Sequence, residues 1–121
     1  MGRRMNGRTR GVTIIISKRR IALWVAGMER WAQKEVSEHT EDTVKGKKKV
    51  DRHGMYCLGV ISAITIAKGK GSHRASMPKD RDQRQGLADA STLLRNVLTS
   101  GRVPGRDYAE LLSHPDSVRA Q

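Results

Sequence analysis

One stretch of the sequence constrains the fold most, because it predicts a long helix with a continuous apolar face. The stretch SKRRIALWVAGMERWAQKEVSEHTED covers residues 17–42. Its apolar residues recur at steps of three and four, which places their side chains on one side of an α-helix. Ser17 is the expected N-cap, and Gly27 costs about 1 kcal/mol relative to alanine. The face consists of Ile21, Trp24, Val25, Met28, Trp31, Ala32 and Val36, together with the polar Glu35.

Shorter elements are expected around this helix. VTIII (residues 12–16) and AITIA (residues 63–67) are β-branched runs, and each predicts a short strand. RHGMYCLGVISA (residues 52–63) is densely apolar, so its period does not distinguish a helix from a buried strand. Asp51 directly precedes that segment and is its expected N-cap.

The C-terminal third predicts two helices. LADASTLLRNVLTSG (residues 87–101) has an apolar stripe at helical spacing, and Gly101 is its expected C-cap. VPGRDYAELLSHPD predicts a turn and a short last helix, with Asp107 as N-cap and Pro115 as its end. The stripe of the first helix consists of Leu87, Ala90, Leu94, Val97 and Leu98.

These elements predict a mainly α protein, in which a long central amphipathic helix is joined by shorter flanking helices and short strand segments. Residues 1–11 contain four arginines, three glycines and no acid, which favours a basic flexible arm. A helix–loop–helix core follows at residues 12–76, then a polar linker at 77–86 and a C-terminal helical segment at 87–121. Only 36% of the 121 residues are apolar and phenylalanine is absent, so the core is lean and an oligomer or partner is expected.

The net charge of +12 predicts a polyanionic partner, and nucleic acid is the commonest polyanion. The alternative is a basic protein without a specific partner. Tryptophan and tyrosine number two each, too few to stack many single-stranded bases, so phosphate contacts with a duplex are favoured. The basic residues expected to bind phosphates are Arg3, Arg4, Arg8, Arg10, Lys18, Arg19, Arg20, Lys45, Lys47, Lys48, Lys49, Arg52, Lys68, Lys70 and Arg74.

The lysine-rich stretch TVKGKKKVDRH, residues 43–53, lies between the long helix and the apolar segment after it. It is open to three interpretations: a solvated cationic loop, a nuclear address, or a loop that holds phosphates between two packed elements. Gly46 is a plausible helix terminator and Asp51 begins the next element. A loop anchored at both ends suits phosphate binding better than a free tail does.

Catalytic and metal-binding patterns are sparse. Cys57 is the single cysteine, so neither an intrachain disulfide nor a cysteine cluster is possible. No two of the four histidines are four residues apart, and GKGSH lacks the spacing of a phosphate loop. We therefore expect a protein that is not an enzyme, with no cofactor and no metal. The apolar run near the N-terminus is too short for a signal peptide or a membrane span, so neither secretion nor membrane insertion is expected.

Residues 12–67 resemble the histone fold. RGVTIIIS is similar to its first loop, where an Arg-Val pair lies beside DNA, and the long helix resembles its central helix. KGKKKVDRHGMYCLGV is similar to its second loop and third helix, and ITIAKG resembles the short strand after that helix in one core histone.

The resemblance implies roles for particular residues. Arg10 and residues 18–20 would lie near phosphates at the first loop, and residues 47–49 would lie at the second loop, beside the first loop of a partner. Because histone folds pair head to tail, the helix face would be a dimer interface. That interface would consist of Leu23, Trp24, Met28, Trp31 and Val36.

Together these features predict a non-enzymatic basic protein that binds nucleic acid through phosphate contacts, as a packaging or structural component of an assembly. It would act in a nucleus or nucleoid, or inside a virion, as a homo- or hetero-oligomer. The alternative is a structural protein of a virion or ribonucleoprotein particle that works mainly through contacts between proteins. The sequence leaves open whether the polymer is DNA or RNA.

Overall fold

The computed structural model describes residues 2–69 and 77–118, with side chains from residue 18 onward. Helix α1 spans Gly2–Glu38, and strands β1 (Thr40–Asp42) and β2 (Lys48–Val50) form an antiparallel hairpin. Helices α2 (Arg52–Ala67), α3 (Arg81–Ser100) and α4 (Tyr108–Ser113) follow, and the 3-10 turn η1 (Pro115–Val118) ends the described chain. The predicted mainly α fold class is confirmed.

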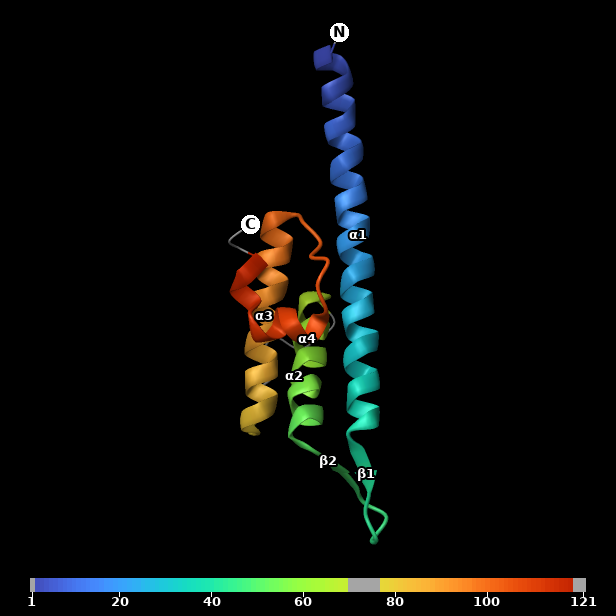
Figure 1. Ribbon diagram of the computed structural model, residues 1–121, viewed down its shortest axis with the longest axis vertical. Coiled ribbons are helices and arrows are strands. Elements are labelled where there is room, and N and C mark those ends of the chain that lie inside the picture. Colours follow the sequence, from blue (N-terminus) through green and yellow to red (C-terminus); the bar gives the residue numbers. More distant parts are fainter. Residues whose placement is uncertain (1, 70–76, 119–121) are drawn as a thin grey trace.

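Helix α1 is the long axis of the molecule, and the other helices pack along its C-terminal half (Figure 1). Helix α2 returns antiparallel to α1, so that Lys68 at its end pairs with Glu29 in the C-terminal half of α1. Helices α2 and α3 run in the same direction, since Arg52 pairs with Asp82 and Tyr56 with Asp89. The hairpin projects from the end opposite the N-terminus.

The predicted apolar face of α1 is confirmed. Ile21, Trp24, Met28 and Ala32 are buried, while Val25, Trp31 and Val36 pack partly against the core. The remaining buried apolar side chains come from α2, α3, α4 and η1: Cys57, Val60, Ala63, Ile64, Leu87, Ala90, Leu93, Leu94, Val97, Leu111, Leu112 and Val118.

Gly27 leaves room for Tyr108 of α4, which explains a glycine inside α1. A Cβ at Gly27 would lie 2.5 Å from the Tyr108 hydroxyl oxygen. That hydroxyl donates a hydrogen bond of 3.0 Å to the carbonyl oxygen of Trp24. The Tyr108 ring also lies 5.6 Å from the ring of Trp24 and 5.9 Å from that of Trp31. These contacts hold the short helix α4 against α1.

Two glycines bring the backbones of α2 and α3 together. A Cβ at Gly86 would overlap the Tyr56 carbonyl oxygen and lie 2.8 Å from its carbonyl carbon. A Cβ at Gly59 would overlap the Gln83 carbonyl oxygen and lie 2.7 Å from the backbone nitrogen of Leu87. Any side chain here would force the helices apart, so this contact depends on glycine at both positions.

Both predicted strands are wrong, because residues 12–16 lie in α1 and residues 63–67 complete α2. Valine, isoleucine and threonine cost only a few tenths of a kcal/mol in a helix, and each residue that extends a formed helix adds one hydrogen bond. In α2, Ala63 and Ile64 face the core, which a helix achieves without a strand partner. Ser17 is inside α1 and therefore is not an N-cap.

Two segment boundaries also differ from the prediction. Residues 2–11, expected as a flexible arm, form the first turns of α1. Helix α3 begins at Arg81 inside the predicted polar linker, because the Asp80 side chain accepts a hydrogen bond from the Gln83 N–H and caps it. The ambiguous segment at residues 52–63 is helical. The predicted caps Asp51 and Gly101 are confirmed, and Asp107 precedes α4 as predicted, although its side chain makes no capping hydrogen bond.

Candidate functional site

The lysine-rich stretch lies largely in the β1–β2 hairpin, residues 40–50, which we call the lysine hairpin. Thr40 pairs with Val50, Glu41 with Lys49 and Asp42 with Lys48. In the turn, the Thr43 carbonyl oxygen accepts a hydrogen bond of 2.9 Å from the Gly46 N–H. Gly46 has a φ of +77°, a conformation that favours glycine, so it shapes this turn and does not end α1 as predicted.

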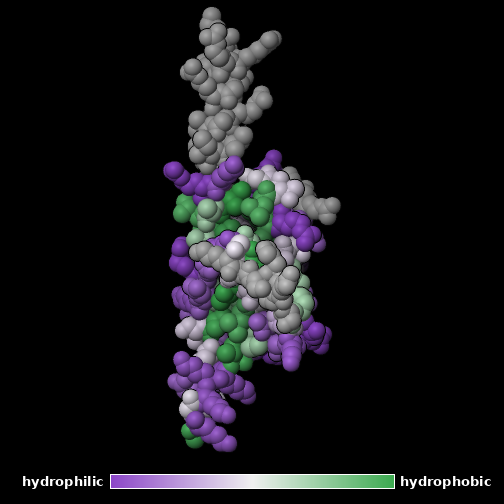
Figure 2. Space-filling model, turned by 180° about the vertical axis from the view of Figure 1, so that it is seen from behind, coloured by the Kyte–Doolittle hydropathy of each residue, from purple (hydrophilic) through white to green (hydrophobic). Residues whose placement is uncertain are grey.

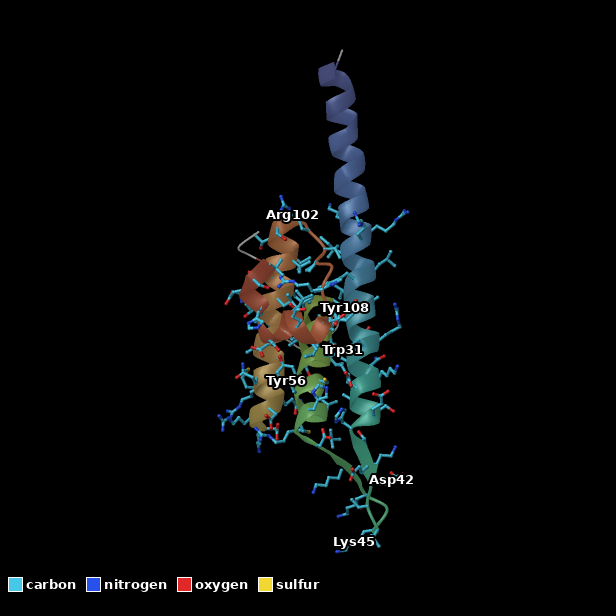
Figure 3. All side chains as sticks on the ribbon, in the orientation of Figure 1. Trp31, Asp42, Lys45, Tyr56, Arg102 and Tyr108 are labelled. Atoms are coloured by element: carbon cyan, nitrogen blue, oxygen red, sulfur yellow. The ribbon has the colours of Figure 1, made fainter. Side chains whose placement is uncertain are left out.

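The four lysines of the hairpin are exposed, and the hairpin itself projects away from the helices (Figure 3). Among the residues with described side chains, no acid forms an ion pair with any of them. Glu41 and Asp42 lie opposite Lys49 and Lys48 across the two strands and reduce the local charge. Lys45 and Lys47, at the turn, have no such acid opposite. The hairpin end of the molecule is largely hydrophilic in the view of Figure 2.

The structure separates the other predicted basic residues instead of joining them to the hairpin. Lys18, Arg19 and Arg20 are exposed on α1, roughly 27 Å from its C-terminal end at 1.5 Å per residue. Arg52 and Lys68 are engaged by acids, at 3.3 Å from Asp82 and 2.7 Å from Glu29. Lys70 and Arg74 lie outside the described residues, as do the side chains of Arg3, Arg4, Arg8 and Arg10.

The face predicted as a dimer interface packs against the chain's own helices. Trp24 and Met28 are buried in the core, and Trp31 and Val36 pack against it. Leu23 does not belong to the buried core, and 64% of its surface is exposed to solvent. Of the five predicted interface residues, Leu23 is therefore the one left largely open to a partner in this arrangement.

A second group of polar side chains, which the sequence did not predict, lies at the base of the lysine hairpin. We call Glu35, His39 and His53 the Glu-His-His cluster. Glu35 Oε2 is 3.8 Å from His39 Nε2 and 3.7 Å from His53 Nε2. The three ligand atoms lie within 4.8 Å of one another, close enough to share a metal ion. His39 and His53 each have acids nearby in the sequence, but a structural or surface role was expected for them, because no two histidines have the spacing of a helical zinc site.

Asp51 links this cluster to the start of α2. One carboxylate oxygen accepts a hydrogen bond of 2.9 Å from the Gly54 N–H, and the other lies 2.7 Å from His39 Nδ1. The Gly54 N–H and His39 together lower the pKa of Asp51. The hydrogen bond to Asp51 raises the pKa of His39. The backbone closes the same junction, because the Asp51 N–H donates to the His39 carbonyl oxygen at 3.1 Å.

Cys57 lies behind the cluster, with its sulfur 3.6 Å from His53 Nε2. Burial raises the pKa of its thiol to about 11, and Glu35 and Asp51 add to the shift. A thiol that stays protonated is a poor nucleophile, so the residue contributes packing rather than covalent chemistry.

His53 also lines a cavity of about 310 Å³ beside Trp31 and Tyr56. The Tyr56 hydroxyl donates a hydrogen bond of 2.6 Å to Asp89, and both residues line this cavity. Burial and the carboxylate of Asp89 raise the pKa of Tyr56, which keeps the phenol protonated. The cavity thus gives solvent and small molecules access to one edge of the Glu-His-His cluster.

Comparisons with known proteins gave no significant match to a protein-family model, a curated protein or a solved structure. The resemblance to the histone fold therefore stays a prediction. Within the described residues, no helix is long and apolar enough to cross a membrane.

Proposed function

We propose that this protein binds nucleic acid through phosphate contacts, with the lysine hairpin as its principal contact surface. The observation that carries the proposal is a cluster of four exposed lysines on a projecting hairpin, none of them in an ion pair within the described part of the chain. Such ammonium groups neutralise phosphates at little cost, because no existing ion pair has to be broken. Arg19 and Arg20 on α1 form a separate exposed basic group, roughly 27 Å from the end of α1 that carries the hairpin.

The aromatic residues support phosphate contact over base stacking. Trp24 is buried, and the side chains of Trp31, Tyr56 and Tyr108 are partly buried. Stacking on single-stranded bases needs exposed rings, so the affinity has to come from charge. Release of counterions then makes the affinity fall steeply with salt and gives little sequence preference.

The test is fluorescence anisotropy with a labelled duplex at a series of salt concentrations. The logarithm of the affinity should fall linearly with the logarithm of salt concentration, with a slope near −0.9 for each phosphate contacted. Replacing Lys47, Lys48 and Lys49 together with alanine should reduce the magnitude of that slope by about 2–3 and weaken binding equally across sequences.

A matched control removes the same charge elsewhere. Arg81, Arg84 and Arg95 are exposed on α3, outside the hairpin, and their triple alanine variant loses three positive charges. If the hairpin is the contact surface, this control should keep most of the slope. Equal losses in the two variants would mean that net charge alone drives binding, and a flat salt response of the unaltered protein would contradict the proposal.

A second candidate is a structural role in a particle, through contacts between proteins. An apolar groove lies between α1, α2 and α3, lined by Ile21, Val25, Leu94 and Leu98 with lysines at its rim. Leu98 is 58% exposed, and hydrophobic residues gather along the middle of the body (Figure 2). The mass of the purified chain with and without nucleic acid separates the candidates: a nucleic-acid-independent oligomer disrupted by Leu98→Glu favours the structural role.

A further inference from the structure

The Glu-His-His cluster brings one carboxylate oxygen and two imidazole nitrogens to one point. His39 Nδ1 lies 2.7 Å from Asp51 Oδ2, so the Nδ1–H donates to that carboxylate. In the neutral imidazole the other nitrogen, Nε2, then carries a lone pair. This lone pair faces Glu35 Oε2 at 3.8 Å. His53 Nε2 approaches the same oxygen at 3.7 Å.

No lysine or arginine with a described side chain balances this group. The ion pairs of Glu35 among those residues are with the two imidazoles, and its side chain is only 24% exposed. The cluster also lies at the C-terminal end of α1, which has no basic residue in its last turn. The dipole of α1 places partial negative charge there and that of α2 places partial positive charge beside His53, so the attraction for a cation comes mainly from the carboxylates of Glu35 and Asp51.

We infer that Glu35, His39 and His53 bind a Zn²⁺ ion through Oε2, Nε2 and Nε2. Two imidazole nitrogens and one carboxylate oxygen are a donor set that suits zinc. In a tetrahedral site with bonds of about 2.0–2.1 Å, ligand atoms lie about 3.3 Å apart. The two separations from Glu35 are within about half an ångström of that value, and the two imidazole nitrogens lie within 4.8 Å of each other, so rotation of the side chains has to close mainly that third distance.

Asp51 occupies the position of a supporting carboxylate. Metal-bound histidines usually donate their second ring N–H to a carboxylate or carbonyl, which fixes the tautomer and the ring orientation. Asp51 does this for His39, and Asp51 is itself held by the Gly54 N–H at 2.9 Å. His39 is therefore oriented for metal binding by the same residue that caps α2.

Three protein ligands leave the fourth coordination position to solvent. Cys57 Sγ lies near His53 Nε2, but it does not belong to the set of ligand atoms that are all within 4.8 Å of one another. His53 also lines the cavity beside Trp31 and Tyr56, which gives a water molecule access to the ion. A bound ion would link the end of α1 to the first turn of α2, which are the two elements that the lysine hairpin connects.

The test is a titration of the full chain, freed of metal by EDTA dialysis, with ZnCl₂ in a calorimeter and in the absence of nucleic acid. One equivalent should bind, and Tm should rise with zinc concentration. Glu35→Gln and His53→Gln should each weaken binding at least tenfold, whereas His114→Gln, a histidine outside the cluster, should not change it. Asp51→Asn should weaken zinc binding about 10–100-fold, as loss of a supporting carboxylate does.

Cobalt reports the ligand set directly. Co²⁺ bound in place of zinc should show visible d–d absorption of a four-coordinate site without an intense thiolate charge-transfer band. A strong charge-transfer band that is lost in Cys57→Ser would overturn the solvent-occupied fourth position. Zinc affinity that is unchanged in both Glu35→Gln and His53→Gln, with circular dichroism showing folded variants, would overturn the site. Neither readout depends on nucleic-acid binding, so this inference and the proposed function can fail separately.

Discussion

Asp51 has two tasks at the residue scale, and both come from its position between the hairpin and α2. One oxygen caps the helix through the Gly54 N–H, and the other holds His39 Nδ1. Any aspartate before a helix can cap it, so the first task was predictable from the sequence. The second depends on His39, twelve residues earlier, which only the antiparallel return of the chain brings within reach.

Asp51 should make stability depend on pH in acid. Its pKa is lowered from 3.8 in the folded protein, so its contribution is complete above that value and is lost as pH falls through the lower folded pKa. Urea denaturation in EDTA should show the free energy of unfolding decreasing below about pH 3.8. Asp51→Asn keeps a cap acceptor but does not titrate, so it should show a shallower decrease. The exposed Asp42→Asn serves as control, and an equally shallow decrease in that variant would refute the assignment.

Cys57 should be nearly inert toward alkylation in the metal-free protein. A pKa of about 11 leaves roughly one thiolate in ten thousand at pH 7, and the side chain is buried. Iodoacetamide should label the folded chain at least about 100-fold more slowly than the chain in urea. Mass spectrometry over time measures both rates, and comparable rates would mean that the thiol is accessible.

At the scale of elements, α2 and α3 are held by a contact that no local pattern reveals. The predicted stripe of α3 is correct for four of its five residues, since Leu98 is exposed. Gly86, the residue just before this stripe, was predicted to belong to the polar linker. The backbones of α3 and α2 meet at this residue. A glycine in a polar stretch indicates a turn by default, and only packing shows that it is needed for close approach.

Gly86→Ala tests that contact. Alanine is the better helix former by about 1 kcal/mol, so propensity alone predicts a stabilised protein. The Cβ would overlap the Tyr56 carbonyl, and we expect a loss of about 1–3 kcal/mol in the free energy of unfolding. Gly105→Ala is the matched control, because nothing lies within 4 Å of its Cβ, and it should change stability by less than about 0.5 kcal/mol. Stabilisation by Gly86→Ala would contradict the close contact.

At the scale of the whole molecule, α1 extends well beyond the bundle at its N-terminal end (Figure 1). The first buried side chain described in α1 is Ile21, so the described core begins there. The projecting turns and the lysine hairpin stand at opposite ends of the molecule. A polyanion bound at both ends would have to extend along the full length of α1.

Deletion of residues 1–16 should therefore separate stability from binding. The free energy of unfolding should change by less than about 0.5 kcal/mol, since no described core residue is removed. Nucleic-acid affinity should fall, because four arginines are lost. Urea denaturation and anisotropy measure the two effects. A large loss of stability would show that these turns pack against another part of the chain or another copy.

The sequence by itself determined the elements whose signals are local: the apolar face of α1, the caps Asp51 and Gly101, and the end of α4 before Pro115. Each of these features depends on residues within one or two helical turns of one another, so their spacing can be read directly from the sequence. The end of α1 at Glu38 and the start of α3 at Arg81 were not predicted. β-Branched, glycine and charged residues have only weak preferences for helix or strand, and packing overrides these preferences.

Only the tertiary structure decided which distant residues meet. The lysines appeared as a loop in the sequence, but the antiparallel return of α2 turned their segment into a paired hairpin. The same return placed His53 beside Glu35, eighteen positions away, and left the other predicted basic clusters apart from the hairpin. The physical reason is that burial of one apolar face fixes how helices lie together, and polar residues at their ends are carried into contact as a consequence.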